Sequence, residues 1–74
     1  MEFAYDKLRG LIKEKFGTQD EFAKSLGMSR TSLNLKLNNA SEFSQKEIIR
    51  AANLLGITLS EVDEYFFTVK VKVS

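Results

Sequence analysis

Apolar side chains recur at helical spacing near the start of the chain. Leu8, Ile12 and Phe16 would share one face of a helix over about residues 5–16, and a glycine follows as a stop. Gly10 interrupts this run. Because glycine weakens a helix by about 1 kcal/mol relative to alanine, we expect it to mark a place where another element packs closely.

Helix starts are marked by short polar signatures along the rest of the chain. Three segments place a glutamate three residues after a threonine or serine, the pattern of a capping box: Thr18–Glu21, Ser44–Glu47 and Thr58–Glu61. Ser29 offers a further N-cap before another apolar run. Glycine or asparagine, both suited to ending a helix, follows the runs that begin after Thr18, Ser29 and Ser44. The pattern therefore predicts four more helices.

The period changes from Phe67 onward, where apolar and basic residues alternate in the two-residue rhythm of a strand. We expect a short β-strand over residues 67–73. Its partner would be the N-terminal segment of residues 2–4, the same strand of a second subunit, or nothing. The predicted fold class is thus all-α, with five helices and a short C-terminal strand. No linker or repeat divides residues 1–74, so we expect one domain.

The composition narrows the classes of function. Hydrophobic residues make up 43% and charged residues 28% of the chain, the balance of a folded protein. Cysteine and histidine are absent, which removes disulfides, the usual zinc ligands and the commonest proton-transfer side chain. We therefore expect no enzyme activity, no catalytic residues, no metal and no cofactor. Without a signal peptide or a long apolar stretch, we also expect a cytoplasmic protein with no membrane contact.

The charge distribution is more informative than its total. A formal net charge of +1 is weak for a nucleic-acid binder. No acid lies between Phe22 and Ser41, however, and this span carries Lys24, Arg30 and Lys36. The distribution fits a DNA-facing surface, and it fits scattered solvated charges equally well.

Two short predicted helices are joined by Gly27-Met28-Ser29, which has the length of the turn in a helix-turn-helix. Ala23 is small where such helices must approach closely, and Leu33 would close the packing from the other side. Each feature also occurs in ordinary helical bundles. Their combination at this spacing predicts a helix-turn-helix over residues 18–38.

The span from Gln19 to Asn38 resembles the helix-turn-helix of the XRE, or Cro and cI-type, phage repressors. The matching features are Gln19, Ala23 four residues later, Gly27 at the turn, and Leu33. Residues 48–57 and 58–62 resemble the fourth and fifth helices of that class, so the likeness covers about residues 5–66. The stretches KFGTQDEFAKSLG, LKLNN and EYFF are similar to short phage proteins described as Cro/cI-like.

This resemblance implies a compact lambda-repressor-like domain that binds double-stranded operator DNA as a phage or prophage transcriptional regulator, in most cases a repressor. Its recognition helix, about residues 29–37, would enter the major groove. Two departures affect that helix. The class has an apolar residue at the position of Lys36 and a glycine near Asn39-Ala40. Leu37 can take over the buried contact while the stem of Lys36 runs along the surface.

Helical geometry predicts which side chains of this helix face outward. With Leu33 and Leu37 pointing inward, the opposite side carries the predicted base-reading residues Arg30, Thr31, Asn34 and Leu35. An arginine paired with guanine O6 and N7 contributes roughly 1–3 kcal/mol of discrimination, and a leucine can contact a thymine methyl. The alternative is an ordinary solvated arginine and an isolated exposed leucine.

Further side chains are candidates for contacts with the DNA backbone. The resemblance implies this role for Gln19, Ser29, Ser32 and Asn38. Lys36 and Lys46 are candidates to neutralise phosphates, although each is equally consistent with a charge that serves solubility.

The predicted tail offers a dimer interface. Two copies paired antiparallel about a two-fold axis would bring together Val69, Val71 and Val73. Such a homodimer would read an inverted repeat with half-sites about 34–36 Å apart. The alternatives are a monomer with a frayed tail and a dimer formed only on DNA or through the helices.

The second functional hypothesis is a helix-turn-helix module that binds another regulator, as an antirepressor or antitoxin would. A marked weakening of binding with salt would distinguish DNA contact from protein contact. With one domain, we expect no small-molecule ligand.

Overall fold

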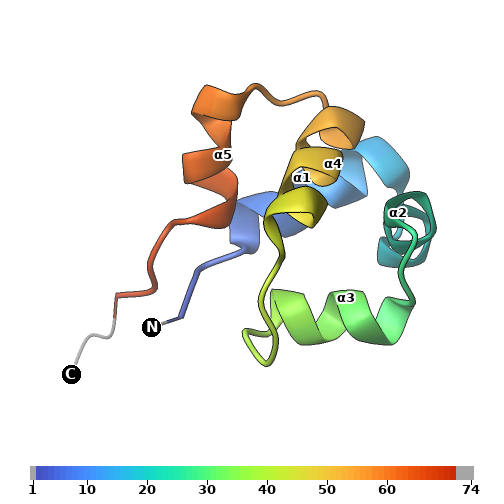
Figure 1. The fold of residues 1–74 in the computed structure, drawn as a ribbon, viewed down its shortest axis with the longest axis horizontal. Helices are drawn as coiled ribbons and strands as arrows, with labels where there is room; N and C mark the ends of the chain where they lie inside the picture. The colour runs from blue at the N-terminus through green and yellow to red at the C-terminus, as the bar shows by residue number, and fades with distance from the viewer. Residues whose placement is uncertain (1, 72–74) are drawn as a thin grey trace.

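Five helices make up most of the computed structural model, which describes residues 2–71 (Figure 1). They are α1 (Asp6–Phe16), α2 (Gln19–Leu26), α3 (Arg30–Leu37), α4 (Gln45–Leu55) and α5 (Leu59–Phe66). The prediction of an all-helical chain is confirmed, and so are the helix boundaries to within one residue. The longest of these helices have 11 residues, and none in the described part of the chain is long and apolar enough to cross a membrane.

The caps expected from the sequence form to different degrees. Ser44 and Glu47 make both bonds of a capping box, 3.1 Å from Glu47 N to Ser44 Oγ and 2.8 Å from Ser44 N to Glu47 Oε1. Thr18 Oγ1 accepts from the backbone N of Glu21 at 3.2 Å, but the carboxylate of Glu21 lies 3.7 Å from the ammonium of Lys24. The start of α2 therefore has the bond from the Glu21 backbone to the Thr18 side chain, without the return bond that would complete a capping box.

The core is formed by the inner sides of all five helices, with α2 packed against α1, α3 and α4. Each of the five helices contributes at least two buried apolar side chains, so no helix is peripheral to the interior. Figure 1 shows α1 and α4 crossing at the centre and α3 along the lower edge. This arrangement leaves one long side of α3 facing away from the rest of the molecule.

The expectation for Gly10 was wrong. Gly10 is exposed, and a Cβ built on it would meet nothing within 4 Å. The core-facing side of α1 is set by Leu8 and Ile12, both fully buried, and Gly10 lies on the side away from them.

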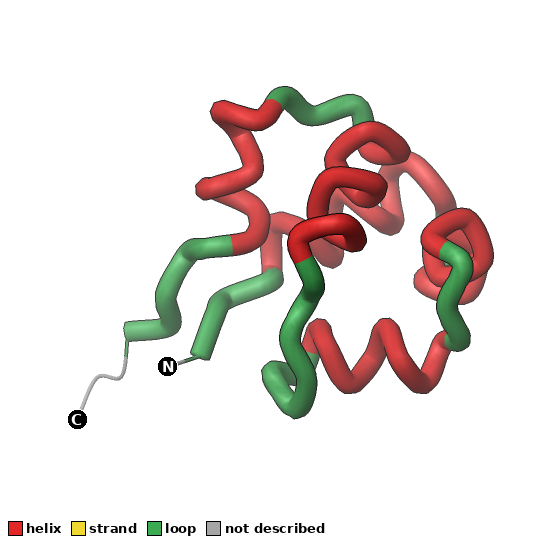
Figure 2. The backbone as a smooth tube through the Cα atoms, viewed as in Figure 1, coloured by secondary structure: helices red, strands yellow, loops and turns green. Residues whose placement is uncertain are grey.

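The predicted C-terminal strand is not seen in the described residues. The tail makes one antiparallel bridge, between Phe3 and Val69, with hydrogen bonds of 2.7 Å from Ala4 N to Thr68 O and 2.9 Å from Lys70 N to Glu2 O. Of the three partners considered, the N-terminal segment is the one contacted. Because α1 begins at Asp6, that segment is too short to extend the ladder. Figure 2 shows both segments as loops lying side by side.

Candidate functional site

The turn between α2 and α3 is built from backbone hydrogen bonds and a left-handed glycine. Gly27 has φ 76°, a conformation that costs glycine little and other residues more. Its backbone N donates to Lys24 O, and Met28 N donates to Ala23 O, each at 3.0 Å. Ala23 is buried where the two helices pack. The sequence placed this turn and its small residue correctly.

An arginine from α4 secures the same turn. Arg50 Nη1 donates to the backbone O of Leu26 at 3.2 Å, and a Cβ added to Gly27 would lie 3.4 Å from that nitrogen. The guanidinium thus satisfies a carbonyl that the end of α2 leaves free. The sequence analysis did not identify Arg50, because nothing local to residue 50 indicates a partner at residue 26.

The orientation expected for α3 is confirmed. Leu33 and Leu37 are buried, whereas Thr31 and Leu35 are exposed, with 47% of the surface of Leu35 accessible. Asn34 is half-buried beside them. The outward side of α3 therefore presents polar side chains around one exposed leucine.

Arg30 is exposed at the start of α3 but does not stand alone. Its Nε lies 3.7 Å from Oδ1 of Asp20, in the first turn of α2. At this distance and exposure the ion pair is weak. The carboxylate nevertheless offsets part of the positive charge at this end of α3, which was not foreseen because Asp20 precedes the acid-free span.

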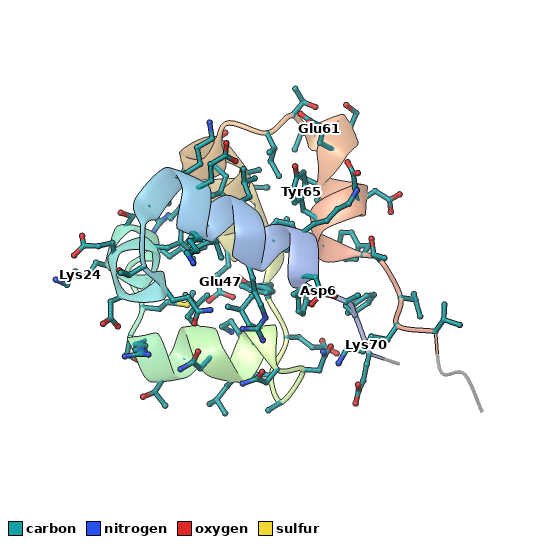
Figure 3. All side chains as sticks on the ribbon, turned by 180° about the vertical axis from the view of Figure 1, so that it is seen from behind. Asp6, Lys24, Glu47, Glu61, Tyr65 and Lys70 are labelled. Atoms are coloured by element: carbon teal, nitrogen blue, oxygen red, sulfur yellow. The ribbon has the colours of Figure 1, made fainter. Side chains whose placement is uncertain are left out.

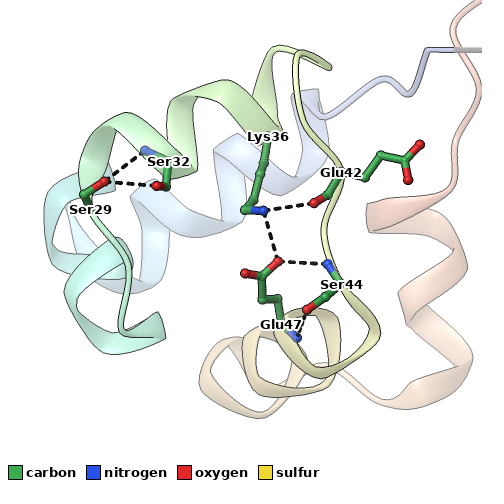
Figure 4. A network of polar contacts seen from close by, with 6 residues as sticks. All are labelled: Ser29, Ser32, Lys36, Glu42, Ser44 and Glu47. Atoms are coloured by element: carbon green, nitrogen blue, oxygen red, sulfur yellow. Dashed lines mark hydrogen bonds and ion pairs between the residues drawn. The ribbon is translucent and has the colours of Figure 1, made fainter.

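Lys36 points away from the outward side of α3. Its Nζ donates to the backbone O of Glu42 at 2.9 Å and lies 3.2 Å from Oε1 of Glu47, and only 13% of its side chain is exposed (Figure 4). The same ammonium lies 6.0 Å from the centre of the Phe43 ring. Lys36 therefore joins α3 to the start of α4, at the position where the resemblance led us to expect an apolar residue. This engagement leaves little of its charge for a phosphate.

The contacts of Glu47 shift its pKa. Burial acts to raise the pKa, but hydrogen bonds from Ser44 and the adjacent Lys36 favour the carboxylate more strongly, so the pKa lies below its usual value. Glu47 thus serves as cap and counter-ion at once (Figure 4).

Asn38 and the end of α3 are held by α1. Arg9 Nη2 donates to the backbone O of Leu37 at 3.0 Å and to Oδ1 of Asn38 at 2.9 Å. Sequence reasoning did not identify Arg9, because its partners are 28 and 29 residues away.

The N-terminal segment is fastened to the same end of α3. Asn39 adopts φ 65° and exchanges two hydrogen bonds with the backbone of Phe3, accepting from its N at 2.8 Å and donating to its O at 2.9 Å. The sequence signalled only that an asparagine tolerates this conformation. The pairing with Phe3 was not predicted.

The remaining predicted site residues lie on several elements. Gln19 is half-buried at the first residue of α2, and Ser29 caps α3 by accepting from Ser32 N at 3.1 Å. Lys46 is exposed in the first turn of α4. Val69 and Val71 are exposed on the tail, and Val73 lies outside the described residues.

Exposed basic side chains are spread over the molecule. Lys24 projects from α2, and Lys70 projects from the tail at the other end (Figure 3). Lys24 lies 3.7 Å from Glu21, and Lys70 lies 3.5 Å from Glu2. These pairs leave the surface without one concentrated positive field.

Comparison with known proteins gives a family and a solved structure of similar fold. A protein-family profile described as "Protein of unknown function (DUF739)" matches residues 1–69. Among curated proteins, none matches the chain. The fold is similar to the solution structure of the modulator of repression (MOR) of the temperate bacteriophage TP901-1 from Lactococcus lactis. That protein is 38% identical in sequence, with 97% of each chain covered and a TM-score of 0.80.

Proposed function

The chain belongs to the phage-type family described as protein of unknown function DUF739, and from that premise we propose a phage regulator that binds double-stranded operator DNA through α3. We place it with the XRE or Cro and cI-type helix-turn-helix regulators. It would act in the cytoplasm on transcription, most often as a repressor, without catalysing a reaction.

The exposed side of α3 is the observation that carries this proposal. α2 packs against the inner side of this helix, Arg50 holds the end of α2 just before it, and no acid occurs from Arg30 to Asn38. The side chains available to base edges are Arg30, Thr31, Asn34 and Leu35. Arginine, asparagine, threonine and an apolar contact are the types that read base edges in the major groove.

Contacts with the DNA backbone would flank this face. We assign them to Gln19, Ser29, Ser32 and Asn38, with Lys46 as a more distant phosphate partner. Lys36 is left out of this set, because its ammonium is already held by Glu47 and the backbone of Glu42.

A homodimer would extend recognition to an inverted repeat. Val69 already pairs with Phe3 on one edge of the tail, so a second copy would join on the other edge. The exposed side chains of Val69 and Val71 fit such a contact.

A second candidate function is binding to another phage regulator. Leu35 is exposed at the middle of the outward side of α3, and Asp20 partly offsets Arg30. These features suit a protein partner better than a phosphate backbone. The likeness to a protein described as a modulator of repression is compatible with this candidate.

The test begins with selection of bound duplexes from a random DNA pool, followed by binding measurements over a range of salt concentrations. Arg30→Ala should weaken binding to the selected site by about 1–3 kcal/mol and leave the melting temperature unchanged. Lys15→Ala, which removes an exposed charge from α1, is the matched control and should have a much smaller effect.

Two results would decide against DNA as the target. The first is a pool with no enriched sequence. The second is a salt-insensitive complex with the purified repressor of the same phage that is lost in Leu35→Ala, which would favour the second candidate.

A further inference from the structure

We propose that an aromatic pocket beside the end of α3 accepts a lysine or arginine side chain from a protein partner. The pocket has a volume of about 260 Å³ and lies between the N-terminal segment, the loop before α4 and the end of α5. The lining residues used below are Phe3, Tyr5, Glu42, Phe43, Phe66 and Phe67. This site is separate from the base-reading face of α3.

The aromatic rings of the pocket brace one another edge to face. Tyr5 and Phe43 lie 5.6 Å apart at 80°, Phe43 and Phe66 5.3 Å apart at 89°, and Phe3 and Phe67 5.8 Å apart at 83°. Tyr5 and Phe66 are buried, so they form a fixed floor. Phe67 is 45% exposed and forms part of the rim. Ring faces attract cations because of their quadrupole.

Glu42 gives the pocket a negative charge. It is the one acid in the lining, and the lining has no basic residue. Its backbone O is held by Lys36, while its carboxylate points away from that ammonium (Figure 4). Burial is the larger cause of the raised pKa of Tyr5, and the charge of Glu42 is the second cause. The carboxylate therefore acts electrostatically on the pocket floor. No ion pair occupies this carboxylate among residues 2–71.

Size and charge together select the occupant. Small-molecule sites usually enclose roughly 300–1,000 Å³, so this pocket is nearer to the needs of one side chain. The carboxylate of Glu42 repels phosphate, which disfavours a nucleic-acid backbone as the occupant. A pocket of aromatic residues whose one carboxylate forms no ion pair within residues 2–71 matches a lysine ammonium or an arginine guanidinium.

The pocket can be tested with blocked amino-acid amides as probes. N-acetyl-lysine amide and N-acetyl-arginine amide are titrated to high millimolar concentration into the full chain, and N-acetyl-norleucine amide serves as the neutral control. Chemical shifts of the Tyr5, Phe43 and Phe67 rings are followed by NMR. We expect saturable shifts with the two cations and weaker or no saturation with the neutral amide.

Glu42→Gln should weaken binding of the cationic amides about two- to fivefold, as loss of an exposed ion pair would. Glu14→Gln removes an exposed carboxylate from α1 and is the matched control, with unchanged binding expected. Melting curves confirm that both variants fold.

Three outcomes would overturn the proposal. They are equal binding of the neutral and cationic amides, equal behaviour of the two glutamine variants, and pocket shifts that follow protein concentration without any probe. The last would identify a second copy as the occupant. None of these outcomes bears on DNA binding by α3.

Discussion

Lys36 shows how a single side chain can be diverted from surface chemistry to structure. The sequence made Lys36 a candidate for contact with a phosphate, yet its ammonium lies against Glu47 and donates to a loop carbonyl. Both side chains are partly withdrawn from water. Removing one charge therefore leaves the other poorly solvated and without its partner, which destabilises the fold.

Glu47→Gln should therefore lower the free energy of unfolding by about 1 kcal/mol at neutral pH, through loss of the ion pair and part of the cap. Glu47 has a folded-state pKa below its ordinary 4.5, so its contribution is complete above pH 4.5 and is lost as pH falls through the folded-state value. The parent and the variant should converge in acid. Urea unfolding at a series of pH values measures this, and parallel curves would contradict it.

Asn39 combines an unusual backbone conformation with two hydrogen bonds to Phe3. Asn39→Ala should destabilise by about 2–3 kcal/mol, because it loses both bonds and replaces asparagine, which tolerates positive φ, with alanine, which adopts it less readily. Asn39→Gly keeps the backbone conformation accessible and should cost about 1 kcal/mol less. Thermal unfolding compares the two, with Asn53→Ala, at an exposed position of α4, as control. Equal losses would mean that the conformation carries no cost.

At the scale of elements, the starts of α2, α3, α4 and α5 follow from their own caps, whereas α1 begins after Tyr5 without a side-chain cap. Ser29, Ser44 and Thr58 each stand one residue before a helix and bond within its first turn. Packing decides what caps cannot, namely which side of each helix is buried. The exposed Gly10 in the middle of α1 is accordingly a local weakness that no neighbour explains.

Gly10→Ala should raise the free energy of unfolding by about 0.5–1 kcal/mol, because alanine restricts the unfolded chain and meets open space in the helix. A rise in melting temperature measures this. A loss of stability would mean that the side of α1 carrying Gly10 is covered by another chain.

At the scale of the whole molecule, the segments of residues 2–4 and 68–70 and the end of α3 form one connected region. Asn39 bonds Phe3, Phe3 bridges Val69, and Glu2 lies 3.5 Å from Lys70. The tail thus contributes to the fold of its own chain, whatever it does in assembly.

Deleting the residues after Phe67 should cost about 1–2 kcal/mol, through loss of two backbone hydrogen bonds, and should convert the proposed dimer to monomers. Val71→Asp is the sharper variant, because it leaves the bridge at Val69 in place and should abolish the dimer without changing the melting temperature. Sedimentation measures the mass. A dimer that survives both changes would exclude the tail as the interface.

The sequence by itself determined the helices, their order, the turn at Gly27 and the inward side of α3. These features depend on side chains within a few residues of one another, where capping and helical periodicity act. For the same reason it located Arg30, Thr31 and Leu35 on the outward side of α3. Tertiary structure alone decided that Lys36 is engaged, that Asp20 approaches Arg30, and that the predicted strand is reduced to one bridge. Those outcomes depend on which distant segment lies opposite each residue, and packing fixes that once the helices have formed.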